Sequence, residues 1–383
     1  MRRIVDTEPL PIKLWLDDIE AGALQQAKNL ANLPFAFKWI AVMPDCHQGY
    51  GMPIGGVLAA RDVVVPNAVG VDIGCGMCAV RASLRGIDRE ALKTVLAGVR
   101  SRVPLGFAHH RHREEWSGFD RAPDLPVIQR ELDAARFQLG TLGGGNHFIE
   151  LQRGPDGAVW IMLHSGSRNF GLKVATEYHR QARRLCESRG YSLPDADLAY
   201  LPMDTKEASD YLAAMNFALD FAKENRFRMV ENVKQALLDV LPASFGETIN
   251  IHHNYAAVET HYGAEVVVHR KGATAAAAGQ TGLVPGSQGA TSYVVRGKGN
   301  PESFMSCSHG AGRRMGRNQA RRQLNLEKEQ RDLDRRGIIH SLRGVKDLDE
   351  AAGAYKDIAQ VMRDQEDLVE VVTELTPLAV IKG

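Results

Sequence analysis

The sequence predicts an α+β fold in which residues 1–383 form a single large domain, with a mixed or antiparallel β-sheet core flanked by helices. Two observations point to this class. Helical stretches and short β-like runs are interspersed along the chain without the regular strand–helix alternation of a parallel α/β sheet. No internal repeat and no low-complexity linker divides the 383 residues. A chain of this length can bury a large core.

Apolar residues recur at helical spacing in four stretches, which we predict to be helices: 14–30, 126–139, 173–188 and 208–241. Seven shorter runs have the composition of strands. They are KWIAVMP (38–44), GGVLAA (55–60), CAVRASL (78–84), VWIMLHS (159–165), TINIHHNY (248–255), AEVVVHR (264–270) and TSYVVRG (291–297). Most of these runs adjoin Gly, Asn or His residues, so polar groups are expected at strand ends or on the loops beyond.

The overall composition is that of a soluble globular protein, with 44% hydrophobic and 24% charged residues. The formal net charge is +1, so any affinity for nucleic acid must come from local patches. The N-terminal residues contain no apolar run that would suit a signal peptide or a membrane span. Five unevenly spread cysteines argue against a disulfide framework and favour the reducing cytoplasm.

The segment SCSHGAGRRMGR (306–317) places His309 among Ser, Gly and Ala residues. Such small neighbours pack poorly around an imidazole and leave room for a large group to approach it. The arginines that follow suggest that this group is an anion, with phosphate the best candidate.

Asp72 and Cys75 are three residues apart on the glycine-rich segment VGVDIGCGMC (69–78). A carboxylate and a thiolate at this spacing can face one cation, and the thiolate favours a borderline or soft divalent metal over magnesium. Cys75 and Cys78 also form a CxxC pair, which leaves redox or structural-zinc use as the alternative. No second CxxC completes a zinc ribbon, so we expect Cys78 to be buried and inert.

Histidines in similar glycine- or asparagine-containing segments extend this constellation. His147 follows a glycine run, His164 ends an apolar run, and His252 and His253 are adjacent. Adjacent residues of a strand point to opposite faces, so only one of the last pair can reach a shared metal. Together with Asp72 and Cys75, these histidines predict either one metal with open positions or two metals that share the thiolate.

Two other segments carry weaker signals. The loop LVPGSQGATSYVV (283–295) offers hydroxyl and backbone N–H groups to a phosphate or a base edge, although a plain β-turn explains it as well. Arg270 and Lys271 add positive charge near this loop in the sequence. The run HHRHREEW (109–116) is predicted to be an exposed loop, either a solvated charged segment or part of a binding surface.

Ten segments, taken together, resemble the RtcB family of GTP-dependent RNA-splicing ligases. They run in the family's order from residue 43 to the C-terminus and cover almost the whole chain. They are MPDCHQGYGMPIGG, VGVDIGCGM, LGGGNHFIE, LHSGSRNFG, HHNYA, HRKGAT, PGSQGATSYVV, SCSHGAGR, AYKDI and PLAVIKG. The resemblance implies an RtcB-like domain and a ligase that joins RNA 3′-phosphate or 2′,3′-cyclic phosphate ends to 5′-hydroxyl ends, in RNA repair or tRNA splicing.

The resemblance also implies the roles of individual residues. His309 would attack the α-phosphorus of GTP and carry GMP covalently. Two Mn²⁺ ions, bridged by Cys75, would be held by Asp72, Cys75, His147, His164 and His253. Arg168 would contact the RNA phosphate. Arg313, Arg314 and Arg317 can serve RNA binding or packing, and both readings stay open. The guanosine site would comprise Asn146, Phe148, Glu150, Asn254, Pro285, Gly286, Ser287, Gln288, Ser292, Gly310, Ala311, Gly312, Tyr355 and Lys382.

The sequence departs from the family's usual pattern at three positions: Cys78, Gln288 and Gly316. None of them removes an implied metal ligand or the nucleophile. Two other classes of function remain as alternatives. A metal-dependent phosphoesterase for cyclic phosphates would use the same ligands but leave His309 without a role. A catalytically idle RNA-binding protein would have no need of the complete ligand set.

Overall fold

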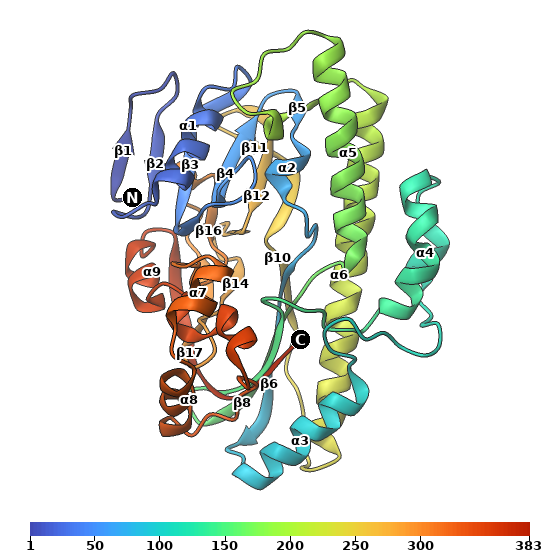
Figure 1. Ribbon diagram of the computed structural model, residues 1–383, viewed down its shortest axis with the longest axis vertical. Helices are drawn as coiled ribbons and strands as arrows, with labels where there is room; N and C mark the ends of the chain where they lie inside the picture. Colours follow the sequence, from blue (N-terminus) through green and yellow to red (C-terminus); the bar gives the residue numbers. More distant parts are fainter.

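The computed structural model describes residues 1–383 and contains two large β-sheets with helices packed against them (Figure 1). The first sheet has six strands in the order β1-β2-β3-β4-β12-β11, and only β2 and β3 run parallel. Its strands are β1 (Arg3–Val5), β2 (Ile12–Leu14), β3 (Ala36–His47), β4 (Ile54–Ala60), β11 (Asn254–His261) and β12 (Ala264–Lys271).

The second sheet has seven strands in the order β10-β6-β8-β7-β17-β15-β14, and every neighbouring pair is antiparallel. Its strands are β6 (Gly76–Arg85), β7 (Phe148–Arg153), β8 (Ala158–Ser165), β10 (Ile249–His252), β14 (Thr281–Val284), β15 (Ser292–Gly297) and β17 (Val369–Lys382). Two short pairs complete the β-structure: β5 (Val63–Val64) with β9 (Leu201–Pro202), and β13 (Ala273–Ala275) with β16 (Ser306–Ser308).

Both faces of the six-stranded sheet are buried at its central strands, which explains why these strands read as continuous apolar runs. In β4, Leu58 and Ala60 belong to one hydrophobic cluster, while Val57 and Ala59 belong to another. Successive side chains of a strand point to opposite faces, so the alternation between the two clusters follows from strand geometry.

Helices α5 and α6 lie side by side along one edge of the molecule (Figure 1). Helix α6 begins where the Thr205 hydroxyl accepts the Ala208 N–H, and α3 begins where Asp88 accepts the Glu90 and Ala91 N–H groups. The α-helices are α1 (Ala21–Ala31), α2 (Pro66–Val69), α3 (Arg89–Arg102), α4 (Pro126–Gln138), α5 (Asn169–Ser188), α6 (Lys206–Leu238), α7 (Arg317–Gln323), α8 (Leu326–Arg335) and α9 (Ile358–Asp364). No helix combines the length and apolar character needed to cross a bilayer.

The predicted α+β class with an antiparallel sheet core is confirmed, and two of the predicted elements need correction. The helix predicted over 14–30 starts only at Ala21, because Leu14 pairs with Val42 as the last residue of β2. The single strand predicted over 248–255 is two strands, β10 and β11. The chain changes sheets at His253, whose N–H donates to the Cys75 carbonyl instead of a strand partner.

Candidate metal and nucleotide site

The sheet order brings the predicted metal ligands together at one end of four neighbouring strands, β10, β6, β8 and β7. Cys75 directly precedes β6, and His147 directly precedes β7. His164 is the penultimate residue of β8 and lies opposite both Met77 and Phe148. His253 follows β10. Three histidines that lie 72 to 178 positions from Cys75 in the chain therefore meet it, because antiparallel neighbours alternate in direction.

The ligand atoms form two groups that share the Cys75 sulfur. Cys75 Sγ lies 3.1 Å from His164 Nε2, which is itself 3.2 Å from His253 Nε2. On the other side, Cys75 Sγ lies 3.6 Å from His147 Nε2, and Asp72 Oδ2 lies 3.2 Å from the same nitrogen. The two groups are thus Cys75–His164–His253 and Asp72–Cys75–His147.

Hydrogen bonds on the far side of two of these rings set their tautomers. Nδ1 of His147 lies 2.9 Å from the Leu142 carbonyl, and Nδ1 of His164 lies 3.2 Å from the Asn146 carbonyl. A carbonyl only accepts, so each Nδ1 carries a proton and each ring turns its Nε2 inward. Burial holds the pKa of His164 well below its usual value, which keeps this ring neutral.

The inward-facing ring nitrogens, the Asp72 carboxylate and the Cys75 sulfur repel one another electrostatically unless a cation lies between them. Burial, followed by the Asp72 charge, raises the pKa of the Cys75 thiol well above its ordinary value. A bound divalent cation reverses that effect, because it stabilises the thiolate directly. Nδ1 of buried His253 adds a ring nitrogen with no hydrogen-bond partner. The donor set therefore fits one or two thiophilic divalent metals.

Cys78 and His252, the two residues that the sequence left as alternatives to Cys75 and His253, lie outside this cluster. Cys78 is fully buried among apolar side chains, and burial raises the pKa of its thiol to about 12. All five cysteines are free, so Cys75 and Cys78 form no disulfide. His252 Nδ1 accepts a hydrogen bond from Arg226 Nη2 at 2.9 Å, away from the metal ligands.

His309 lies beside the cluster, on the loop that follows β16. Its ring packs edge-on to His253, with 4.8 Å between the ring centroids. Asp45 Oδ2 lies 2.6 Å from His309 Nδ1 and also accepts the His309 backbone N–H. Burial alone would raise the pKa of Asp45, but His309 holds this pKa below its ordinary value. The ionised carboxylate keeps the proton on Nδ1, and Nε2 is left with a lone pair.

Two glycines leave room around this histidine and its carboxylate partner. Gly272 has φ +59°, and a Cβ there would lie 3.1 Å from His309 Cε1 and 2.3 Å from an Ile54 methyl group. Gly312 has φ +73°, and a Cβ there would overlap the Asp45 carbonyl. Side chains at these positions would displace the His309–Asp45 pair. Glycine is therefore required both between β12 and β13 and in the turn after His309.

Arg168 directly precedes α5 with its side chain partly buried, and its backbone has φ +57°. Its Nε donates to the Thr141 hydroxyl at 2.9 Å, and one terminal nitrogen donates to the Gly106 carbonyl at 3.1 Å. The other terminal nitrogen lies over Gly143, where any Cβ would collide with it. These contacts hold the guanidinium next to His147, a predicted metal ligand.

Glu350 is the centre of an ion-pair network that links several predicted guanosine-site residues. Its carboxylate lies 3.5 Å from Lys382 Nζ and accepts a hydrogen bond from the Tyr355 hydroxyl. Its backbone carbonyl accepts from Gln288 Nε2 at 2.9 Å. Arg313 also pairs with this carboxylate, at 3.2 Å, and its side chain is largely buried, which favours the packing reading of that arginine.

Strand pairing joins the other predicted guanosine residues to this network. Lys382 lies opposite Phe148, and Glu150 lies opposite Val380 in the β7–β17 pair. Burial raises the pKa of Glu150 to about 7. The Ser292 hydroxyl accepts the Gly286 N–H in the predicted phosphate loop.

The remaining predicted residues adjoin the metal ligands or His309. Asn254 donates to the Asp72 carbonyl, and Asn146 is the carbonyl partner of His164. Three further members, Gly310, Ala311 and Gly312, directly follow His309 in the chain. The predicted nucleotide and metal residues therefore form one continuous region.

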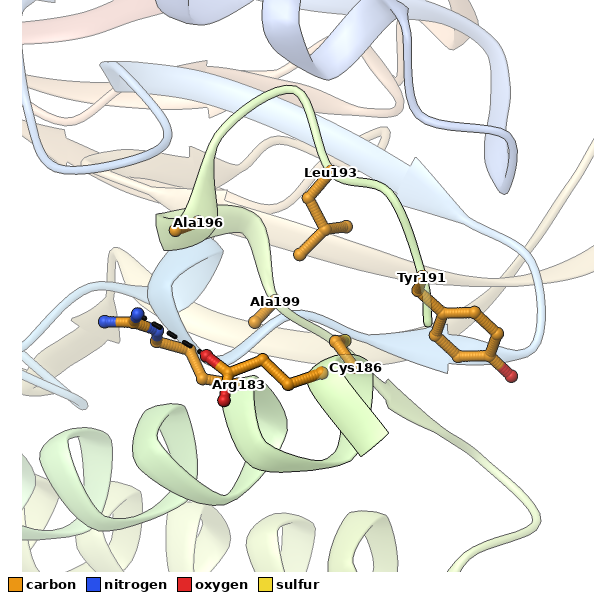
Figure 2. A pocket seen from close by; sticks show the side chains of 7 residues that line it. Arg183, Cys186, Tyr191, Leu193, Ala196 and Ala199 are labelled. Carbon is orange, nitrogen blue, oxygen red and sulfur yellow. Dashed lines mark ion pairs between the residues drawn. The ribbon is translucent and has the colours of Figure 1, made fainter. Parts of the chain in front are cut away.

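Cavities locate the accessible part of this region. A cavity of about 320 Å³ is lined by Gln288, Glu350, Lys382 and Gly383, together with Phe107 from the loop before α4. A second cavity of about 180 Å³ lies at the C-terminal end of α5, between the Arg183–Glu187 ion pair and Leu193 (Figure 2). None of the predicted site residues lines the second cavity, so it lies outside the candidate site.

Two functional candidates were missed in the sequence, Asp45 and Glu350. Asp45 belongs to the segment MPDCHQGYGMPIGG, which carried the family resemblance, but its partner His309 lies 264 residues later. Glu350 belongs to a short 3₁₀ segment, Val345–Glu350, with no motif of its own. The sequence offered a signal only for the first.

Comparison with known proteins gives consistent matches across the chain. The model of a family described as "tRNA-splicing ligase RtcB" matches residues 26–383. A protein of Escherichia coli named "RNA-splicing ligase RtcB1" is 42% identical over 407 residues, which cover 99% of both chains. The "RNA-splicing ligase RtcB" of E. coli K12 is 41% identical with the same coverage. The "tRNA-splicing ligase RtcB" of Pyrobaculum aerophilum is 32% identical over 98% of this chain and 95% of its own.

Proposed function

Because the chain belongs to the RtcB family, we propose that it is a GTP-dependent RNA ligase that joins 3′-phosphate or 2′,3′-cyclic phosphate ends to 5′-hydroxyl ends. The observation that carries this proposal is the position of His309. Asp45 contacts Nδ1 of its ring, which leaves Nε2 free for a substrate. The ring packs against His253, a member of the thiolate–imidazole cluster. We propose RNA repair or tRNA splicing as its purpose, with broken RNA as its substrate.

The cluster suits Mn²⁺ because sulfur and imidazole ligands disfavour Mg²⁺, which prefers oxygen. One ion would be held by Asp72, Cys75 and His147, and a second by Cys75, His164 and His253. When bound, these ions supply positive charge to the phosphate oxygens of the reactants.

His309 carries the first chemical step. Its Nε2 forms a bond to the α-phosphorus of GTP, and the bond to the β-phosphate oxygen breaks to release pyrophosphate. Asp45 fixes the ring orientation and stabilises the positive charge that develops on the imidazole. The product is a guanylyl-histidine. The His309 side chain is partly exposed on a turn of small residues, which lets the nucleotide approach the ring.

The later steps move GMP to the RNA and then expel it. An oxygen of the RNA 3′-phosphate attacks the guanylyl phosphorus and frees His309, after a cyclic phosphate has first been hydrolysed. The 5′-hydroxyl of the second RNA then attacks the activated 3′-phosphate, and GMP leaves. Arg168 is suited to hold the RNA phosphate, because its guanidinium is fixed beside His147.

The guanosine would occupy the region between β7, β17 and the Glu350 network. Glu150 and Lys382 lie on paired strands, and Tyr355 and Gln288 are tied to Glu350. A buried carboxylate such as Glu150 accepts N–H groups of a guanine edge well once it is ionised. We place the reaction in the reducing cytoplasm, where an unoxidised thiolate such as Cys75 persists.

Incubation with GTP labelled in the α-phosphate, in the presence of Mn²⁺, tests this proposal. After denaturing electrophoresis, the ligase should retain the label on the protein and lose it when RNA with a 3′-phosphate is added. A phosphoesterase that only opens cyclic phosphates would process such RNA ends without ever becoming labelled. A protein that only binds RNA would do neither.

A further inference from the structure

The loop between α3 and α4 holds a second cluster of metal-ligating side chains, formed by His110, His112 and Glu114. Their ligand atoms all lie within 4.8 Å of one another. Glu114 Oε1 is 3.1 Å from His112 Nε2 and 3.9 Å from His110 Nδ1. The cluster belongs to the HHRHREEW run, and none of its residues is part of the proposed ligase centre.

Backbone hydrogen bonds at both ends hold this segment in place. The His110 N–H donates to the Phe137 carbonyl at 3.0 Å, and the Glu114 N–H donates to the Arg136 carbonyl at 2.9 Å. Both acceptors belong to the last turn of α4. The two outer ligands are therefore fixed to a helix, and His112 lies between them with its side chain largely exposed.

Neighbouring charged side chains leave one oxygen of the Glu114 carboxylate free for the two imidazoles. Arg228 lies 3.9 Å from Glu114 Oε2, whereas both imidazoles approach the other oxygen, Oε1. Arg113, the basic residue next to Glu114, is turned to Asp133 at 2.6 Å. Oε1 of Glu114 thus remains directed at His110 and His112.

The two separations from the carboxylate to the imidazoles are close to those in a transition-metal site. Ligands about 2.1 Å from a tetrahedral Zn²⁺ are about 3.4 Å apart. The measured separations of 3.1 and 3.9 Å lie on either side of that value. We propose that His110, His112 and Glu114 bind a divalent cation of the zinc class, with a fourth position open to water or to a ligand. Two imidazoles and one carboxylate disfavour Mg²⁺ and Ca²⁺.

The same loop reaches the proposed ligase centre, so the cation would stabilise a segment that adjoins this centre. Gly106, four residues before His110, donates its N–H to the Gly143 carbonyl and accepts a hydrogen bond from Arg168. The metal would connect three side chains of residues 110–114 and so make this part of the loop more rigid, next to helix α4. Its binding does not depend on the proposed ligase activity.

Zinc content after equilibrium dialysis tests this site on the full chain. His112→Ala and Glu114→Gln are suitable variants, because the first side chain is exposed and the second change preserves shape. The matched control is His109→Ala, which removes an exposed neighbouring histidine outside the cluster. Each cluster variant should bind one Zn²⁺ fewer per chain than wild type, whereas the control should bind as many. Equal zinc content in wild type and both cluster variants would overturn the proposal.

Cobalt substitution separates this site from the thiolate centre. Co²⁺ at Cys75 gives a sulfur-to-metal charge-transfer band, and Co²⁺ on two imidazoles and a carboxylate does not. His112→Ala should therefore lose visible ligand-field intensity while it keeps the charge-transfer band. Loss of both bands in parallel would mean that the loop ligands have no site of their own.

Proteolysis gives a readout within the loop itself. Arg111 and Arg113 are exposed cleavage sites for trypsin between the three ligands. Zn²⁺ should slow cleavage after these arginines in wild type and in His109→Ala, but not in His112→Ala. Cleavage that is unaffected by Zn²⁺ in wild type would contradict the proposed site.

Discussion

Asp45 Oδ2 lies 2.6 Å from His309 Nδ1 and accepts the backbone N–H of the same residue. The two contacts fix both the ring and the backbone from which it projects. Since Asp45 is fully buried, its charge is not screened by water. A histidine held in this way presents one defined nitrogen, Nε2, to a substrate.

Asp45→Asn should therefore slow guanylylation of the protein strongly. An amide of the same size removes the negative charge and no longer imposes the Nδ1–H tautomer. We expect a fall of about two to four orders of magnitude in the rate of adduct formation. The rate is measured with labelled GTP in single-turnover mixtures, alongside thermal unfolding to show that the fold is kept. An unchanged rate in a folded variant would remove Asp45 from the mechanism.

Arg168→Ala should separate the two halves of the reaction. The guanidinium faces the metal ligands, and we assign it to the RNA phosphate rather than to guanosine. The GMP adduct should still form, while ligation falls by about one to two orders of magnitude for a lost charge-assisted contact. Because Arg168 also donates to Thr141 and Gly106, Arg168→Lys is the control for charge without these bonds. A parallel loss of adduct and ligation would place Arg168 in the GTP site or in the fold.

Cys75 and Cys78 should respond differently to replacement. Cys75→Ala removes the sulfur common to both ligand groups and should abolish activity and reduce bound manganese. Cys78→Ser keeps the metal, since Cys78 packs in the core behind β6, and should lower the free energy of unfolding by about 1–3 kcal/mol for a buried hydroxyl without a partner. Metal analysis of the purified variants decides the matter. Equal loss of manganese in both would instead indicate a paired-thiolate site.

Glu150 should make GTP binding depend on pH. Its pKa of about 7 means that the carboxyl group is protonated at pH 6 and ionised at pH 8. Only the ionised form accepts two N–H groups of a guanine edge, so affinity for GTP should rise with pH through 7. Titration of wild type and Glu150→Gln at several pH values measures this, and changes common to both proteins are subtracted. An identical pH profile in the two proteins would exclude Glu150 from the base contact.

The same group affects stability with a defined sign. A raised pKa in the folded state means that the native protein retains a proton which the unfolded chain, with a pKa of about 4.3, has already released. Between these two pKa values, rising pH therefore favours unfolding. Denaturant midpoints should fall over this interval by less in Glu150→Gln than in wild type. A steeper fall in the variant would contradict the assigned pKa shift.

Much of the candidate site could be predicted from the sequence, because its predicted metal ligands lie at the ends of strands. The apolar runs that became β6 and β8 also placed Cys75 and His164 beside glycine or serine at their ends. Alternation of side chains indicated that only one of His252 and His253 could reach a shared metal. In the structure, His253 lies beside Cys75 and His164, whereas His252 contacts Arg226. The assignment of individual residues to GTP and RNA rests on the family resemblance.

The features that were missed depend on contacts distant in the chain. The predicted helix over 14–30 has suitable periodicity, but pairing of Leu14 with Val42 outweighs it. The Glu350 network joins residues 288, 313, 355 and 382 around a carboxylate whose own segment has no pattern. Local sequence carries no information about such a meeting point until the strands are paired.

The most direct test of the account is adduct formation by His309→Ala. The His309 side chain is partly exposed and belongs to no hydrophobic cluster, so the variant should fold and bind manganese as wild type does. It should form no acid-labile GMP adduct, because the phosphorus–nitrogen bond needs the missing imidazole. It should also fail to seal 3′-phosphate ends, yet still join RNA supplied with a preformed 3′-end guanylyl cap. A GMP adduct formed from GTP by His309→Ala would contradict the central assignment.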